Sequence, residues 1–309
     1  MSPKREQEMV PRAEFQSYYG RPILKEPVWT WEIPLYFFSG GLAGASAALG
    51  FGAGLAGNDV LARRAWAAAF GGITASPALL VSDLGRPKRF LNMLRVFKPT
   101  SPMSIGSWLL SASWAAIGVA ASHEILGWFP ARVGRSAGAA AALLGLPLTS
   151  YTAALVADTA VPVWHEARHE LPFMFGGSAM ASAGAVASML TPASHAGPAR
   201  RLTVAGAIVE GTASQVMQRR LGDLAAPYHS GTCGRLSQVA KTLTAAGALA
   251  TCFGGRRDRR LRLAGGAAAV AGAVLERWAV FRAGFQSARD PGYTVEPQRE
   301  RARSGPGPG

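Results

Sequence analysis

Long stretches without a charged side chain alternate with short polar segments along the chain. Five such stretches contain no Asp, Glu, Lys or Arg, and they span residues 33–57, 65–82, 99–123, 136–157 and 171–199. Because an α-helix rises 1.5 Å per residue, about 20 apolar residues cross a bilayer core about 30 Å thick. The pattern therefore predicts membrane-spanning helices and argues against a soluble globular enzyme.

Three further segments are less apolar, because they contain charged residues such as Glu210, Lys241 and Glu276. With them, the predicted spans are 33–56, 63–82, 104–123, 137–157, 171–190, 202–218, 236–255 and 261–281. The expected fold is all-α, a polytopic membrane bundle of eight transmembrane helices with both termini on one side. The domain organisation expected is a polar N-terminal segment 1–32, a membrane domain 33–286 and a disordered polar tail 287–309.

Composition and charge agree with a membrane location. Of the 309 residues, 49% are hydrophobic and 16% are charged, whereas soluble domains have about 25% charged residues. The formal net charge is +14. Basic residues in the loops and tails of a membrane protein lie beside anionic head groups. Lipid, and not nucleic acid, is therefore the expected partner of the positive charge.

Few residues of this chain are suited to hold a metal or a redox cofactor. Cys233 and Cys252 are the two cysteines, too few for an iron–sulfur cluster or a structural zinc site. A membrane-bound b-type haem needs axial ligands from within helices, but the five histidines fall in predicted loops or at span ends. We expect no haem, no iron–sulfur cluster and no metal site in this chain.

The polar residues suited to binding or proton transfer lie on one side of the predicted bundle. Eight spans place both tails and residues 83–103, 158–170 and 219–235 on the same side, which we call the N-face. The candidates found there are Glu32, Asp83, Arg86, Asp158 and His165. Loops held by a rigid scaffold often carry binding residues. Asp83 and Arg86 are equally compatible with a basic rim that contains an internal ion pair, a docking surface, or a proton-relaying carboxylate.

Two tyrosines are expected at similar depth beneath the N-face. Tyr36 lies four residues past Glu32, about 6 Å into the first span, and Tyr151 lies seven residues before Asp158, about 10 Å into the fourth. Phenol, carboxylate and imidazole groups there can hydrogen-bond an amphipathic ligand that arrives from the lipid. For Tyr36, membership of the interfacial aromatic belt is an equally good interpretation. Glu210, inside the sixth span, should face the bundle interior or a wet cavity.

Four segments carry a resemblance to a known family: WEIPLYFFSGGLAG (31–44), DLGRPKRFLNML (83–94), PTSPMSIGSW (99–108) and DTAVPVWHEAR (158–168). They resemble the NrfD family, which includes the membrane subunit of polysulfide reductase. The resemblance is strong from about residue 18 to residue 176. It implies a cofactor-free, multi-pass subunit in the plasma membrane of a prokaryote.

The resemblance also implies a function. The subunit would exchange electrons between membrane quinone or quinol, an exchangeable substrate, and a ferredoxin-like iron–sulfur subunit connected to a molybdopterin oxidoreductase subunit. The quinone pocket would lie within residues 33–170, near the N-face. By this resemblance Tyr36, Tyr151, Arg86 and Glu32 are quinone-binding candidates. Proton transfer would fall to Asp83, Asp158 and His165.

Two other functions fit the residues. In a permease, Glu210 and Glu276 would line a solute path; in a passive anchor, the chain would hold a complex in the membrane without quinone chemistry. Bound quinone and a co-purifying iron–sulfur protein would separate the first interpretation from these two.

Overall fold

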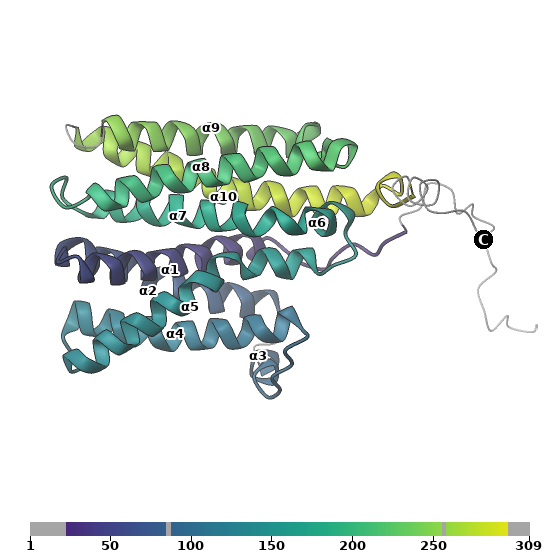
Figure 1. Cartoon of the computed structure of the whole chain (residues 1–309). Helices are drawn as coiled ribbons and strands as arrows, with labels where there is room; N and C mark the ends of the chain where they lie inside the picture. Colours follow the sequence, from purple (N-terminus) through teal and green to yellow (C-terminus); the bar gives the residue numbers. More distant parts are fainter. Residues whose placement is uncertain (1–22, 85–87, 255–257, 296–309) are drawn as a thin grey trace, which may run out of the picture.

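The structure is a computed structural model that describes residues 23–84, 88–254 and 258–295. Every regular element in these ranges is helical (Figure 1). The long helices are α1 (Glu32–Leu55), α2 (Asp59–Asp83), α4 (Pro102–Leu126), α5 (Ala131–Ala157), α7 (Leu171–Leu190), α8 (Gly197–Leu221), α9 (Gly231–Phe253) and α10 (Arg259–Arg289). The short ones are α3 (Lys88–Met93), α6 (Pro162–Glu166) and two 3₁₀ helices, η1 (Ala167–His169) and η2 (Gly222–Tyr228).

Six of the long helices are long and apolar enough to cross a membrane: α1, α2, α4, α5, α7 and α10. Among the described residues, the predicted all-α fold is thereby confirmed, with six helices that could span a membrane. Helices α8 and α9 lie where the sixth and seventh spans were predicted, but their composition does not meet the same measure of hydropathy. The count of eight spans stays a prediction.

Several helices extend beyond the apolar stretches that predicted them, because charged residues also occupy helix ends. Helix α2 begins at Asp59, where the side chain of Asn58 accepts a hydrogen bond from the Leu61 backbone N–H at 3.2 Å. Helix α10 continues to Arg289, past the predicted start of a disordered tail at Ser287. That boundary was wrong because Ser287 is fully buried against the bundle. Residues 296–309 lie outside the described residues.

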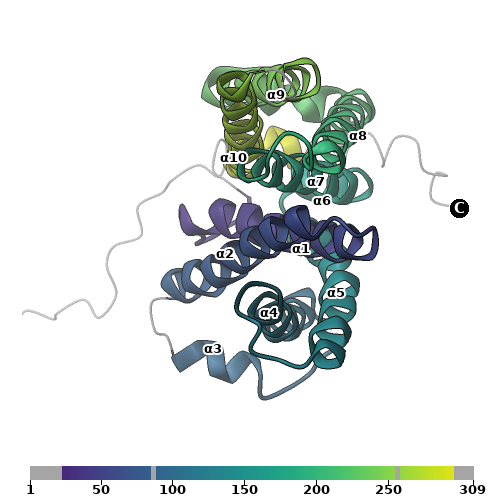
Figure 2. The ribbon, with the colours of Figure 1, turned by 90° about the vertical axis from the view of Figure 1, so that its left-hand side faces the viewer.

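The long helices form two halves with the same pattern of contacts. In the first half α1 packs on α2, α4 on α5, and α1 on α5; in the second half α7 packs on α8, α9 on α10, and α7 on α10. Figure 2 shows the first helix of each half, α1 and α7, side by side at the centre. The α1–α7 contact therefore joins the two halves.

Glycines let helix backbones touch within each half. A Cβ added to Gly44 of α1 would lie 2.4 Å from the carbonyl oxygen of Gly145 of α5. Between α7 and α8, a Cβ on Gly206 would lie 2.3 Å from the backbone nitrogen of Ala181. Small residues permit this close approach in a lipid environment, where association depends on packing rather than on the hydrophobic effect.

The two ends of the described chain lie at the same end of the bundle. The guanidinium of Arg289, at the end of α10, donates to both carboxylate oxygens of Glu26 at 2.9 and 3.0 Å. Helices α3 and α6 are at this end too (Figure 1). This end corresponds to the N-face of the sequence analysis, and we keep that name for it.

Candidate functional site

Two phenol groups meet near the N-face end of the first half. Tyr36, in the second turn of α1, and Tyr151, near the end of α5, are in contact through their hydroxyl groups. Tyr36 is 1% exposed, whereas Tyr151 is half-buried. The similar depth expected from the sequence is confirmed by this contact. It places two hydroxyl groups, each able to donate and to accept, in the interior of the first half.

A third helix holds the ring of Tyr151. Gly106, in the second turn of α4, lies so close that an added Cβ would be 2.2 Å from Cε2 of this ring. Glycine at this position lets the ring approach the α4 backbone closely. The sequence analysis included Gly106 in a motif but gave it no role, because a single helical glycine does not reveal what lies against it.

Polar contacts continue one turn deeper, between α1 and α2. The hydroxyl oxygens of Ser39 and Ser76 lie 2.8 Å apart, and the Ser76 hydroxyl donates to the carbonyl of Gly72 at 2.9 Å. Both serines are buried. The sequence analysis missed this pair, because serine is common in membrane helices as a small packing residue.

At the N-face itself, one threonine brings together the predicted carboxylates Glu32 and Asp83. The Thr30 backbone N–H donates to Asp83 Oδ1 at 3.2 Å, and its hydroxyl lies 2.9 Å from the same oxygen. That hydroxyl also contacts the carboxylate of Glu32, which Ser82 Oγ approaches at 3.5 Å. Because a hydroxyl has one proton, Thr30 can donate to only one carboxylate at a time. The predicted partner of Asp83, Arg86, lies outside the described residues.

Asp158 and His165 lie beside each other at the end of α5. Asp158 directly follows Ala157, and the Ala157 carbonyl oxygen is 3.2 Å from Nδ1 of His165. Since a carbonyl oxygen only accepts, this contact places a proton on Nδ1 and leaves Nε2 free to exchange one in the neutral ring. Both side chains are exposed. In the described ranges, neither hydrogen-bonds to the tyrosine pair.

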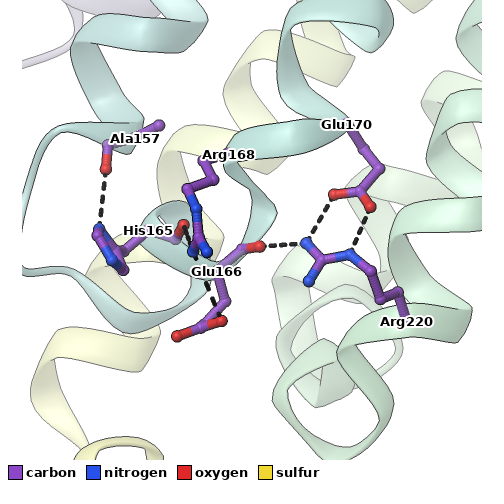
Figure 3. Close-up of polar contacts among 6 residues, drawn as sticks. All are labelled: Ala157, His165, Glu166, Arg168, Glu170 and Arg220. Carbon is purple, nitrogen blue, oxygen red and sulfur yellow. Dashed lines mark hydrogen bonds and ion pairs between the residues drawn. The ribbon is translucent and has the colours of Figure 1, made fainter.

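The segment that carries His165 is fastened to the second half of the bundle (Figure 3). Arg220, near the end of α8, donates from Nε to Glu170 Oε1 at 2.5 Å and from Nη2 to Oε2 at 2.7 Å. The same Nη2 contacts the backbone carbonyl of Glu166. Arg168 donates to the carbonyl of His165 at 3.2 Å. These contacts fix the chain between α6 and α7, and the sequence analysis did not identify them.

A comparison with protein families identifies the chain. The family model described as "Polysulphide reductase, NrfD" matches residues 23–255, most of the chain. The chain belongs to the NrfD family. This match confirms the resemblance and extends it to the end of α9, well past residue 176. All seven predicted site residues lie inside the NrfD match. A search of curated proteins gives no match to the chain.

The described part of this NrfD protein has no group of three or more His, Cys, Asp or Glu side chains placed to hold a metal ion. Cys233 and Cys252 do not form a disulfide. The chemistry that these NrfD residues can provide is hydrogen bonding and proton exchange, through two phenols, three carboxylates and one imidazole.

The Glu170–Arg220 pair of the NrfD bundle leads to a pH prediction. Hydrogen bonds from Arg220 hold the pKa of the Glu170 carboxyl below its usual value. A carboxyl with a lowered pKa stabilises the folded state above its unfolded pKa of about 4.3, and the effect is lost as the pH falls through the lower native pKa. We expect Glu170→Gln to lower stability by about 1 kcal/mol at pH 7, because the pair is partly solvent-exposed.

Thermal unfolding in detergent, measured from pH 7 to pH 3, checks this expectation. The difference between Glu170→Gln and the unchanged chain should shrink toward zero in the acid range. Arg220→Gln and the double variant complete a cycle that isolates the pair from other effects of each change. A difference that stays constant with pH would show that the ion pair is not its source.

Proposed function

We propose that this NrfD protein is the quinone-reactive membrane subunit of a multi-subunit oxidoreductase in a prokaryotic plasma membrane. It binds quinone or quinol at the Tyr36–Tyr151 pair and exchanges electrons with a ferredoxin-like iron–sulfur subunit, itself linked to a molybdopterin oxidoreductase subunit. The observation that carries this proposal is the meeting of the two phenols between α1 and α5, directly beneath the N-face carboxylates.

The tyrosine pair fits the head group of a quinone. A quinone carbonyl accepts a hydrogen bond, and each phenol can donate one. Tyr36 is buried whereas Tyr151 is half-buried, so a head group approaches Tyr151 first. Exposed apolar side chains on the neighbouring surface, Trp108 of α4 and Leu146 of α5, would face the isoprenoid tail in the lipid.

Protons and electrons leave a quinol by different routes in this proposal. Oxidation of a quinol to a quinone releases two electrons and two protons. Asp83, Asp158 and His165, at the N-face, accept the protons, because a carboxylate or a neutral imidazole acts as a general base. The electrons pass to the iron–sulfur partner, since the two cysteines of this chain cannot ligate a cluster.

The N-face is the proposed docking surface for that partner. It holds α3 and the segment from α6 to α7, and an electron carrier bound there would lie close to the tyrosine pair. We also propose that all eight long helices span the bilayer, so that α8 and α9 cross it despite their lower hydropathy, with both chain ends on the N-face side.

Removing one hydroxyl from the pair tests the proposed quinone site. Loss of one neutral hydrogen bond costs about 0.5–1.5 kcal/mol, so Tyr151→Phe should raise the KM for quinol roughly two- to tenfold. Asp158→Asn should lower kcat more than it raises KM, because the carboxylate transfers protons. Steady-state kinetics of the assembled complex measure both effects.

A matched control comes from the same helix. Among the described residues, the hydroxyl of Thr149 of α5 donates only to the carbonyl of Leu146, at 2.7 Å, so Thr149→Val removes a hydroxyl without touching the tyrosine pair. It should leave the quinol kinetics unchanged. If Tyr151→Phe and Asp158→Asn both behave like this control, quinone does not bind at the pair, and Tyr151 serves helix packing.

A further inference from the structure

The second half of the bundle contains a cavity of about 530 Å³ that the proposed function does not use. Helices α8, α9 and α10 form its walls, with contributions from Met174 of α7 and Tyr228 of η2. Its surface is mostly apolar, and its volume is in the range of small-molecule binding sites, about 300–1,000 Å³. Helices α8, α9 and α10 lie on the opposite side of the α1–α7 contact from α5, the helix of Tyr151 (Figure 2).

Four buried polar groups that line this cavity have an atom without a hydrogen-bond partner among the described residues. They are Glu210 Oε2, Thr244 Oγ1, Tyr228 Oη and Glu276 Oε1, and each of these residues is at most 7% exposed. A buried polar group without a partner is destabilising, because it has lost its hydrogen bonds to water and gained none. A ligand that hydrogen-bonds to these groups would remove that destabilisation. The burial of Glu210 also confirms its predicted orientation toward the bundle interior.

The charges around the cavity balance. Glu276 Oε2 accepts from Arg277 Nη1 at 3.0 Å, and Arg277 Nη2 donates to the carbonyl of Phe175 at 2.7 Å. Lys241 lines the cavity and is close enough to interact electrostatically with Glu210 and Glu276. With Arg277 paired to Glu276 and Lys241 near both carboxylates, neither sign of charge is in excess beside the cavity. An ionic head group would have no net opposite charge there to offset its desolvation, which favours an uncharged head group.

The cavity opens between α8 and α9. Three of its lining residues are apolar and largely exposed, Ile208 of α8 at 62%, and Leu249 and Phe253 of α9 at 58% and 79%. In the proposed topology this surface faces lipid. A ligand would therefore enter sideways from the bilayer, with its polar head toward Glu210 and Lys241 and its apolar tail between the two helices.

We infer that this cavity is a second binding site, for a flat, uncharged, lipid-soluble molecule whose ring bears carbonyl or hydroxyl groups, as quinones and quinols do. The Lys241 ammonium donates to a carbonyl oxygen, and the free Glu210 oxygen accepts from a hydroxyl group. Binding here does not depend on a quinone site at Tyr36 and Tyr151. The inference concerns binding alone and includes no electron transfer.

Photolabelling with an azido-quinone tests the inference on the full chain in lipid vesicles, with labelled peptides mapped by mass spectrometry. We expect label on α8 and α9. Gly211 of α8 lines the cavity, and a Cβ added there would meet no atom within 4 Å. Gly211→Leu should therefore place a side chain in the cavity without a backbone clash, obstruct the ligand and reduce the label on α8 and α9.

Two further variants serve as a control and as a test of one hydrogen bond. Gly118 of α4 is also a helical glycine with nothing within 4 Å of an added Cβ, and Gly118→Leu should leave the α8 and α9 label unchanged. Thr244→Val keeps the shape of a side chain whose hydroxyl has no partner among the described residues, and it should weaken labelling roughly two- to tenfold by removing one hydrogen bond to the ligand.

The labelling results test the cavity and the proposed quinone site separately. Absence of label on α8 and α9, label that is not reduced in Gly211→Leu, or a phospholipid that occupies the cavity in native mass spectrometry would overturn the inference. Label on α8 and α9 with none on α1, α4 or α5 would support it and contradict the proposed quinone site. Label at both places, with Tyr151→Phe weakening only the label on α1, α4 and α5, would support both sites.

Discussion

Replacing Gly106 with alanine is expected to lower kcat/KM for quinol of the assembled complex up to about tenfold, as loss of the Tyr151 hydroxyl does. The added Cβ would lie 2.2 Å from Cε2 of Tyr151, so the ring has to move about 1 Å to regain ordinary contact. That movement separates the Tyr151 hydroxyl from Tyr36 and from a bound head group. The displaced hydroxyl loses one neutral hydrogen bond, which costs about 0.5–1.5 kcal/mol, or up to about tenfold.

Gly118→Ala is the matched control for this experiment, because it lies on the same helix and an added Cβ meets nothing within 4 Å. Both variants should assemble with the partner subunits at the level of the unchanged chain. If Gly106→Ala assembles and turns over normally, the position of the Tyr151 ring has no part in the reaction.

The second large effect concerns stability. In Gly44→Val, a Cβ would lie 2.4 Å from the carbonyl oxygen of Gly145, and a Cβ on Gly145 would lie 2.6 Å from the carbonyl oxygen of Gly44. Neither backbone can move aside without separating α1 from α5. We expect a loss of about 3 kcal/mol or more, at the upper end of the usual cost of overpacking.

The folded fraction after detergent extraction, followed by size-exclusion chromatography and thermal unfolding, measures this loss. Gly52 lies two turns further along α1, is exposed, and has no atom within 4 Å of an added Cβ. Gly52→Val should therefore behave like the unchanged chain. Equal stability of the Gly44 and Gly52 variants would contradict the close backbone contact between α1 and α5.

The fold was largely predictable because a membrane helix appears in the sequence as a charge-free stretch about as long as a bilayer crossing requires. The five strongest stretches correspond to α1, α2, α4, α5 and α7. Helices α8 and α9 gave weaker signals for a physical reason: Glu210, Lys241 and Thr244 line an internal cavity, so these helices are polar inside. Hydropathy averages over a helix and does not distinguish an inward polar residue from an outward one.

The candidate site was only partly predictable. Tyr36 and Tyr151 could be matched in depth because the rise of a helix is constant. The Thr30–Asp83 and Glu170–Arg220 contacts join residues 53 and 50 positions apart, on elements whose relative rotation no periodicity specifies. Gly106 was missed for the same reason, since its role depends on which side of α4 faces α5.

The opposite charges inside the second half bear on how the protein is made. A charged residue at the middle of a helix costs about 2.5–3.5 kcal/mol when that helix enters the bilayer through the translocon. Glu210 lies mid-way along α8 and Lys241 along α9, and their electrostatic interaction exists only when both helices are present. In the eight-span topology, α8 and α9 would thus enter the membrane together as a hairpin, with the short helix η2 between them and each helix offsetting the insertion cost of the other.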